Sequence, residues 1–269
     1  ETGGILDEIL KKLANQQEKE ASIKKKVKSA STYPVILLVI TIIAFFGTML
    51  FIIPKIGGIL KDLGGEDAEL PVYTKALLSA SDFMVSYWYI FIIILVAGTF
   101  MLFRYIRTEK GKRAWHRFLL RIPVVKTIVI KVAVARFSRI FASLMSSGVG
   151  VLEALKVTGN AIGNTIIKEE LEEAAKQVKN GKQLSEPLST SKHFPPIVAQ
   201  MLATGEETGK VDTVLVKVAD FYEEEVDAAI DAMSSIIEPV MIVLMGGMVG
   251  LIAASVLGPI ASLSQNIGE

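Results

Sequence analysis

Residues 6–54 have the sequence LDEILKKLANQQEKEASIKKKVKSASTYPVILLVITIIAFFGTMLFIIP, and 205 positions later residues 211–259 repeat its pattern as VDTVLVKVADFYEEEVDAAIDAMSSIIEPVMIVLMGGMVGLIAASVLGP. The two copies share Asp7/Asp212, Leu10/Leu215, Lys12/Lys217, Ala14/Ala219, Glu18/Glu223, Glu20/Glu225, Ser29/Ser234, Pro34/Pro239 and Pro54/Pro259. In each copy a charged amphipathic segment leads to a proline, then to an apolar stretch and a second proline. Self-similarity at long range indicates a duplicated structural unit.

The duplication predicts a tandem membrane protein, because each copy carries a helix that enters the bilayer from the same side. The first copy begins at the last helix of its unit. We therefore expect that an N-terminal domain equivalent to the residues before Glu207 is largely absent from this sequence.

The composition agrees with a membrane protein. Hydrophobic residues make up 51% of the 269 residues, and the mean hydropathy of +0.47 is high for a soluble domain of this length. The formal net charge of +1 gives no general polybasic character, so we predict no nucleic-acid partner. The absence of cysteine excludes disulfides, thiolate zinc sites and cysteine nucleophiles.

Three segments carry no charged residue over a length close to the ~20 residues that span a bilayer: 34–53, 83–103 and 240–257. Seven lysines lie between residues 11 and 28, and eight Lys or Arg lie between 104 and 126. The intervening segment 55–82 has three lysines, and the tail after Pro259 has no Lys or Arg. The positive-inside rule therefore predicts a cytoplasmic N-terminus and an outer-side C-terminus.

These boundaries predict an all-α membrane protein with three transmembrane helices and a cytoplasmic helical bundle. The predicted segments are 1–33 (last helix of a truncated first cytoplasmic domain), 34–54 (first span), 55–82 (outer-side loop), 83–103 (second span), 104–235 (second cytoplasmic domain), 236–259 (third span) and 260–269 (outer-side tail).

Within the second cytoplasmic domain, apolar residues recur at helical spacing between glycines and prolines. We predict helices over residues 132–145, 151–158, 165–178, 196–204 and 212–235. Ser185 is expected to cap a further helix that has Pro187 in its first turn.

The sequence offers no catalytic residue, metal site or cofactor-binding motif. Residues 205–210 (GEETGK) resemble a phosphate loop but have three residues between the glycines instead of four, and Val211 stands where Ser or Thr would hold magnesium. His116 and His193 are the only histidines, and neither has a metal-ligand partner at helical spacing. We interpret both as surface or helix-packing residues. The acidic runs 169–173 and 223–225 are interpreted as solvated helix faces, with a partner-binding or cation-binding role left open.

Four features are candidates for structural or partner contacts. Arg136 and Arg139 share one helix side and could pair with acids inside the bundle or on a partner. Residues Gly205 to Gly209 are predicted to form a tight turn with a positive φ at Gly209, placing Glu206 and Glu207 near the start of the last helix. Glu238 precedes Pro239 at the mouth of the third span. Four small residues recur every four positions and predict a helix-packing face: Gly246, Gly250, Ala254 and Gly258.

Several motifs together resemble the type II secretion F family, the inner-membrane platform proteins of type II secretion systems and type IV pili. The matching motifs are ARFSR (135–139), LMSSGV (144–149), EAL (153–155), GN (159–160), FPP (194–196), GEETG (205–209), VADFYEEEV (218–226) and EP (238–239). The resemblance covers nearly the whole chain. It implies two homologous six-helix cytoplasmic domains and three spans, of which the first domain is here largely missing.

The resemblance also implies a function without enzymatic activity of the chain's own. A hexameric cytoplasmic assembly or secretion ATPase would dock beneath the platform, and pilin or pseudopilin subunits would be drawn from the lipid bilayer into a filament. Other inner-membrane assembly proteins and further copies of the chain, in a homo-oligomer, are the remaining expected partners. A permease subunit of an ATPase-driven transporter is the alternative, and a receptor-like signalling module is a third possibility.

Overall fold

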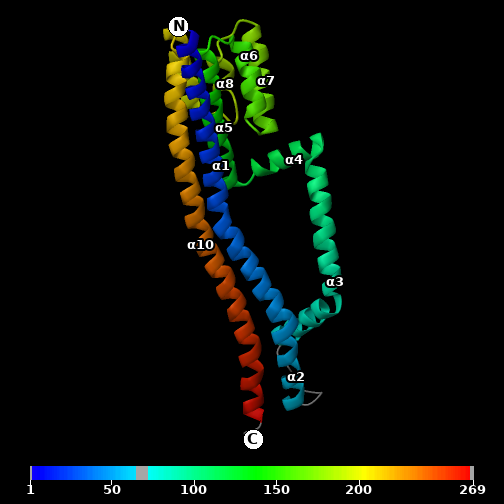
Figure 1. The fold of residues 1–269 in the computed structure, drawn as a ribbon. Coiled ribbons are helices and arrows are strands. Elements are labelled where there is room, and N and C mark those ends of the chain that lie inside the picture. Colours follow the sequence, from blue (N-terminus) through cyan, green and yellow to red (C-terminus); the bar gives the residue numbers. More distant parts are fainter. Residues whose placement is uncertain (1, 65–71, 267–269) are drawn as a thin grey trace. The chain divides into compact units, whose positions relative to one another are not determined.

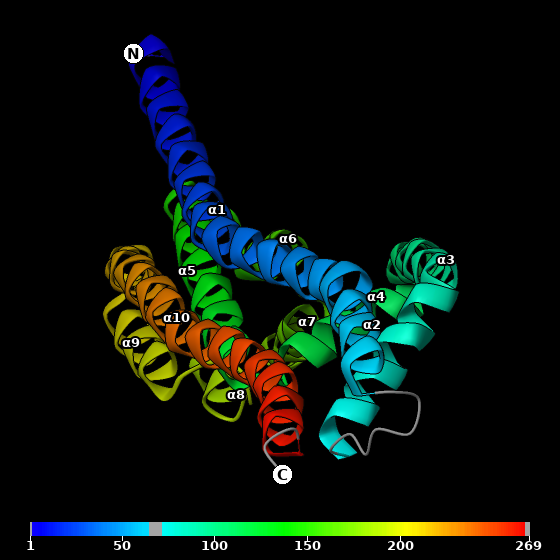
Figure 2. The ribbon, with the colours of Figure 1, turned by 90° about the horizontal axis from the view of Figure 1, so that it is seen from below.

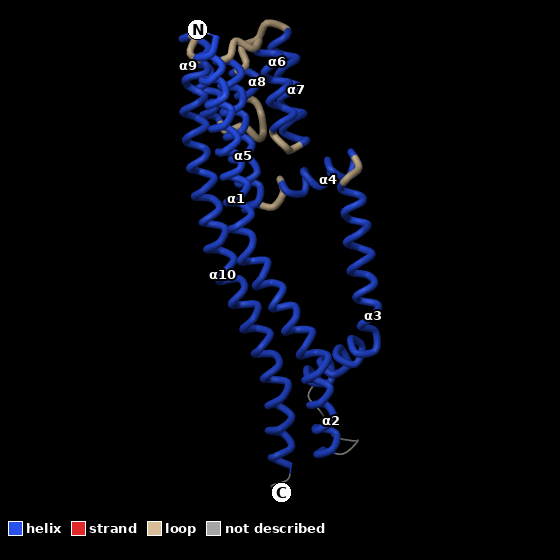
Figure 3. Tube along the Cα trace, in the orientation of Figure 1, coloured by secondary structure: helices blue, strands red, loops and turns tan. Residues whose placement is uncertain are grey.

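The computed structural model describes residues 2–64 and 72–266, and these residues form helices joined by short turns (Figure 3). The described part of the chain has no strand, which confirms the all-α prediction. The chain divides into two compact units. Glu1–Ala30 and Phe103–Met233 form the first, the bundle unit, whereas Ser31–Leu102 and Ser234–Glu269 form the second, the apolar unit.

Figure 1 labels the helices in chain order. They are α1 (Thr2–Gly47), α2 (Ile53–Gly64), α3 (Val72–Ile106), α4 (Glu109–Leu119), α5 (Pro123–Ser146), α6 (Val151–Ala161), α7 (Thr165–Lys179), α8 (Ser185–Ser189), α9 (Pro196–Thr208) and α10 (Val211–Asn266). A π-helical turn, Thr48–Ile52, separates α1 from α2. Both α1 and α10 contain residues of the two units, and the second repeat continues helically through Pro239 as the first does through Pro34.

The bundle unit is organised around α5. Phe137 and Phe141 are fully buried and stack with ring centroids 5.4 Å apart, and Phe194 packs edge-on against Phe137 at 5.1 Å. Leu202 of α9 and Leu215 of α10 belong to the same core. Figure 2 shows α9 beside the first turns of α10. Because burial of large apolar side chains dominates folding free energy, this core fixes the positions of the polar groups around α5.

The sequence located the helices of this unit well but misjudged several of their ends. Helices α6 and α7 begin at the predicted residues, whereas α5 begins nine residues before the predicted start, at Pro123. A proline fits the first turn of a helix, so the apolar pattern alone had placed the start too late. The prediction that Ser185 caps α8 is wrong. Leu184 holds the cap position without a side-chain bond, and Ser185 is already helical.

The described residues include three helical stretches that are long and apolar enough to cross a membrane, with candidate spans Val35–Ile59, Thr74–Ile106 and Val211–Ala254, and the third of these begins in the bundle unit. Large apolar side chains along them are exposed, as membrane helices require: Ile43 is 65%, Leu95 70% and Val243 73% accessible. A small core of Met49, Ile53 and Leu77 joins the π-helical turn and α2 to α3.

The segment 55–82, expected as a loop, is helical wherever the structure describes it. Helix α2 continues to Gly64, and α3 already begins at Val72. The buried Ser81 hydroxyl donates a hydrogen bond to the Met49 carbonyl at 2.6 Å. This bond ties the start of α3 to the π-helical turn, a contact between residues 32 positions apart that sequence periodicity does not report.

Candidate functional site: a charged junction in the bundle unit

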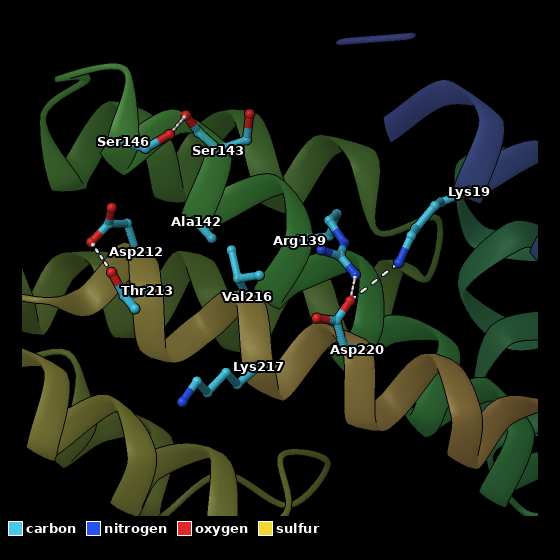
Figure 4. Close-up of a pocket in the computed structure, with 10 residues that line it drawn as sticks. All are labelled: Lys19, Arg139, Ala142, Ser143, Ser146, Asp212, Thr213, Val216, Lys217 and Asp220. Atoms are coloured by element: carbon cyan, nitrogen blue, oxygen red, sulfur yellow. Dashed lines mark hydrogen bonds and ion pairs between the residues drawn. The ribbon is translucent and has the colours of Figure 1, made fainter. Parts of the chain in front are cut away.

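Four charged side chains from three helices meet at one place, which we call the charged junction: Lys19 of α1, Arg139 of α5, and Asp220 and Glu223 of α10 (Figure 4 shows all but Glu223). Glu223 divides its oxygens, with Oε1 2.9 Å from Arg139 Nε and Oε2 2.7 Å from Lys19 Nζ. Asp220 Oδ1 accepts from Arg139 Nη2 and, at 3.1 Å, from Lys19 Nζ. The junction thus contains two cationic and two carboxylate side chains, one acid for each base.

The junction is half-buried, so these charges matter more than ordinary surface pairs. The side chains of Arg139 and Glu223 are only 18% and 15% exposed, against 38% for Lys19 and 51% for Asp220. The hydrogen bond to Glu223 raises the pKa of Lys19. Burial alone would raise the pKa of Asp220, but the bonds from Arg139 and Lys19 outweigh it and hold that pKa below its ordinary value. Lys19, Arg139 and Asp220 are therefore charged at neutral pH.

Two further ion pairs extend the contact between the same helices. Lys26 of α1 pairs with Asp227 of α10, seven residues beyond the first contacts on both helices. Lys131 of α5 reaches Glu225 at 2.7 Å. Because the contacts advance in the same direction on α1 and α10, the two helices run parallel in the bundle unit, as the duplicated sequence requires (Figure 1). The acidic run 223–225, interpreted from sequence as a solvated face, is in fact largely paired.

A groove of about 720 Å³ lies beside the junction. Figure 4 shows its lining, which combines Ser143 and Ser146 of α5 with Asp212, Thr213 and Lys217 of α10, next to Arg139 and Lys19. Both signs of charge line it. The groove therefore lacks the single-sign lining that would select an anion or a cation.

Arg136 and Arg139 have different surroundings despite their shared helix side. Arg139 pairs with acids inside the chain, which is one of the two alternatives that the sequence left open. Among the described residues Arg136 forms no ion pair. Its Nη1 lies 3.5 Å from the Ile162 carbonyl, and its buried Nε has no partner there. Gly163, which has φ 83°, allows this approach because a Cβ would lie 3.2 Å from Arg136 Nη1.

The turn around residues 205–209 also differs from its prediction. Gly209 takes the expected left-handed conformation with φ 69°, and a Cβ on Gly205 would lie 2.9 Å from Val211 Cα, so α9 and α10 approach closely. The placement of Glu206 and Glu207 at the start of the last helix is wrong, because both residues lie in the last turn of α9. Glu207 is exposed. Glu206 instead caps α8, accepting from the backbone N–H groups of Leu184 at 2.7 Å and Ser185 at 3.2 Å.

We expect Glu206→Ala to lower the stability of the bundle unit by about 1–2 kcal/mol, because two backbone donors at the start of α8 lose their acceptor. The midpoint of thermal unfolding of the detergent-purified protein measures this loss. Glu207→Ala, which removes an exposed neighbour with the same charge, is the matched control. Equal midpoints for the two variants would refute the capping role.

The remaining candidates lie in the apolar unit. Glu238 and Pro239 are both exposed within α10. Gly246, Gly250 and Ala254 are exposed as well, and Gly258 lies in the same helix. A Cβ placed on Gly246 or Gly250 would meet no described atom within 4 Å. That these small residues pack against another helix stays a prediction.

Both histidines have structural surroundings. His193 Nδ1 lies 2.6 Å from Glu170 Oε1 and joins the turn before α9 to α7. His116 Nδ1 accepts from the Thr165 backbone N–H at 2.9 Å, at the first residue of α7, where Asn164 also caps the helix. No group of His, Asp or Glu within the described ranges is arranged to hold a metal ion.

The His116 contact predicts a pH dependence. Burial, and secondarily the charge of Lys112, lowers the pKa of His116 below its ordinary 6.5. Between the folded and unfolded pKa values the unfolded chain binds more protons, so His116 stabilises fully above about pH 6.5 and less as pH falls through that window. We expect the unfolding midpoint to fall less steeply below about pH 6.5 in His116→Gln, whose side chain does not titrate. An unchanged slope would exclude this contribution.

Comparison with known proteins shows to which family the sequence is similar. The family model for type II secretion system (T2SS), protein F, matches residues 1–54 and 137–259, and each range contains one copy of the repeat. A type IV pilus assembly protein PilC from Thermus thermophilus is 42% identical over 263 residues, covering 97% of this chain and 64% of that protein.

Two further relatives support the same assignment. The type IV pilus assembly protein PilC of Myxococcus xanthus is 38% identical, over 99% of this chain and 63% of its own length. The type II secretion system protein F of Pseudomonas aeruginosa is 35% identical, over 100% of this chain and 65% of its own length. The chain thus spans slightly less than two thirds of the length of these relatives. It belongs to the type II secretion system protein F family.

Proposed function

We propose that this chain is the membrane-platform part of a type IV pilus or type II secretion machine. Its bundle unit receives force from a hexameric cytoplasmic ATPase, and its apolar unit passes that force to pilin or pseudopilin subunits in the inner membrane. The names of the relatives, which are pilus assembly proteins and secretion proteins F, support this class of machine.

The charged junction is the observation that carries the proposal. Lys19 and Glu223 lie on α1 and α10, and both of these helices extend into candidate membrane spans. Arg139 holds α10 to α5, the central helix of the bundle unit, through Asp220 and Glu223. A movement of α5 therefore acts on two membrane helices at once. Ion pairs that are partly withdrawn from water can specify the register of two helices, which is what a coupling element needs.

The energy source lies outside the chain in this proposal. Residues 205–210 do not form a phosphate loop, since residues 205–208 complete α9 and Gly209 ends it. The N-terminus and residues 104–235 face the cytoplasm, where the ATPase docks on the bundle unit. The C-terminus lies on the outer side. Other inner-membrane assembly proteins and further copies of the chain complete the platform around the three spans.

Deletion and complementation test the function. In the bacterium that encodes the protein, we expect deletion of its gene to abolish surface filaments or secretion, and the restored gene to recover them. The solubilised protein should co-purify with a hexameric ATPase and should not hydrolyse ATP alone. Unchanged filaments and secretion after deletion, or ATP hydrolysis by the purified chain, would exclude a platform role.

A further inference from the structure

Helix α4 has an unusual orientation for an amphipathic helix. It follows α3 after two residues and has the sequence EKGKRAWHRFL. Its polar side faces the bundle: Arg113 pairs with Glu169 at 2.8 Å, and His116 contacts Thr165, both on α7. Because residues 114, 115 and 118 lie on the opposite side of the helix from 113 and 116, the apolar face points away from α7.

None of the described residues covers that apolar face. Phe118 is 52% and Trp115 36% exposed, and their rings pack together with centroids 5.8 Å apart. Phe137, Phe141 and Phe194 of the same bundle are buried, so an aromatic pair facing outward needs a covering medium.

The position of α4 next to a membrane span is fixed locally. The Thr108 side chain caps α4 through the Gly111 N–H at 3.1 Å and donates to the Tyr105 carbonyl at 2.7 Å. A Cβ on Gly111 would lie 1.9 Å from that same carbonyl oxygen, so only glycine permits this close turn. Tyr105 is in the last turn of α3, whose candidate span ends at Ile106. Trp115 therefore follows the end of that candidate span by nine residues and Phe118 by twelve.

Cations flank the same face. Lys110 and Arg117 lie seven residues apart on one side of the helix, and Arg121 follows directly after it. All three are exposed, and among the described residues none of them has an ion-pair partner. Aromatic residues on one face with Lys and Arg beside them are the composition of helices that lie in the headgroup region of anionic membranes.

We propose that α4 is an interfacial helix: Trp115 and Phe118 insert into the leaflet that α3 leaves, and Lys110, Arg117 and Arg121 bind the headgroups of anionic phospholipids. The bundle unit thereby rests on the membrane surface through the side of α4 opposite to α7. This inference depends on α3 spanning the membrane and does not depend on the platform function.

Tryptophan quenching tests the insertion. The full chain carries two tryptophans, Trp88 and Trp115, so Trp88→Phe leaves one reporter. In nanodiscs we expect lipids brominated in the upper acyl chain to quench Trp115 strongly, and aqueous acrylamide to quench it weakly. The control carries Trp88→Phe, Trp115→Phe and Leu152→Trp, which moves the reporter to an exposed site on α6. Its tryptophan should be quenched weakly by the brominated lipids and strongly by acrylamide. If Trp88→Phe does not fold, the difference between the wild type and Trp115→Phe gives the same information.

Bromine placed on one lipid at a time tests headgroup recognition. In equimolar phosphatidylglycerol and phosphatidylcholine, bromine on phosphatidylglycerol should quench Trp115 more, with about fivefold local enrichment for each engaged cation. We expect equal quenching by the two brominated lipids in the triple variant Lys110→Gln/Arg117→Gln/Arg121→Gln. Lys156→Gln/Lys179→Gln/Lys192→Gln, which removes the same charge from other exposed positions, should keep the stronger quenching by phosphatidylglycerol. Equal quenching by the two lipids in the wild type, or a Trp115 that is shielded from acrylamide but unquenched by brominated lipid, would overturn the proposal.

Discussion

Replacing Ser235 with proline should abolish filament assembly or secretion while leaving the protein in the membrane. Residue 235 lies inside α10, two residues past the boundary between the bundle unit and the apolar unit. A proline there removes the hydrogen bond to the carbonyl of Asp231 and clashes with the preceding turn, at a cost of about 3 kcal/mol or more. If force passes from the bundle unit along α10, breaking the helix here disconnects it from the membrane.

Ser235→Ala is the matched control. It removes the same hydroxyl and any contact that the hydroxyl makes, but it keeps the helix, because alanine has the highest helix propensity. We expect Ser235→Ala to assemble filaments at the wild-type level. Membrane fractionation should recover both variants equally, since neither changes the apolar segment that follows residue 239.

The measurement is the amount of surface filament or secreted protein in cells that produce each variant at equal levels. Normal assembly by Ser235→Pro would mean that α10 does not need to be continuous between the units. Loss in both variants would assign the defect to the hydroxyl group. Either result would leave transmission along α10 without support from this variant, although a platform role would still stand.

The sequence predicted those parts of the fold that depend on local pattern. Long uncharged stretches predicted the three apolar helices, and recurrence at 3.6-residue spacing located α6 and α7. Helix ends were less certain, because they depend on caps that come from elsewhere in the chain. Ser185 has the residue type of a cap, but Glu206, 21 positions away, supplies the carboxylate that accepts from α8.

The charged junction shows the same limit more sharply. Arg139 was identified as a candidate for pairing because it shares one helix side with Arg136 at i, i+3 spacing. Its partners Asp220 and Glu223 lie 81 and 84 residues away in the sequence. Lys19, which also bonds Asp220, is separated from it by 201 positions. One local signal was available for Asp220 and Glu223: their i, i+3 spacing places them on one side of α10, next to the face that carries the buried Leu215 and Val226.

Reversing the charge of Arg139 should destabilise the bundle unit by about 2–4 kcal/mol. Arg139→Glu places a third carboxylate against Asp220 and Glu223, and removing one partner of a half-buried pair leaves the others without compensation. The unfolding midpoint of the purified protein should fall by about 5–15 °C. Arg113→Glu, which breaks a more exposed pair with Glu169, should lower stability by less than about 1 kcal/mol.

A charge swap distinguishes a contact inside the chain from a contact with the ATPase. In Arg139→Glu/Glu223→Arg the junction again holds two cations and two carboxylates, with Lys19 left to pair with Asp220. We expect this double variant to recover more than half of the lost stability and to assemble filaments again. Recovered stability without filaments would mean that Arg139 also contacts the ATPase. A double variant as unstable as Arg139→Glu would show that these ion pairs do not hold α10 to α5, and the coupling proposed for the junction would fail.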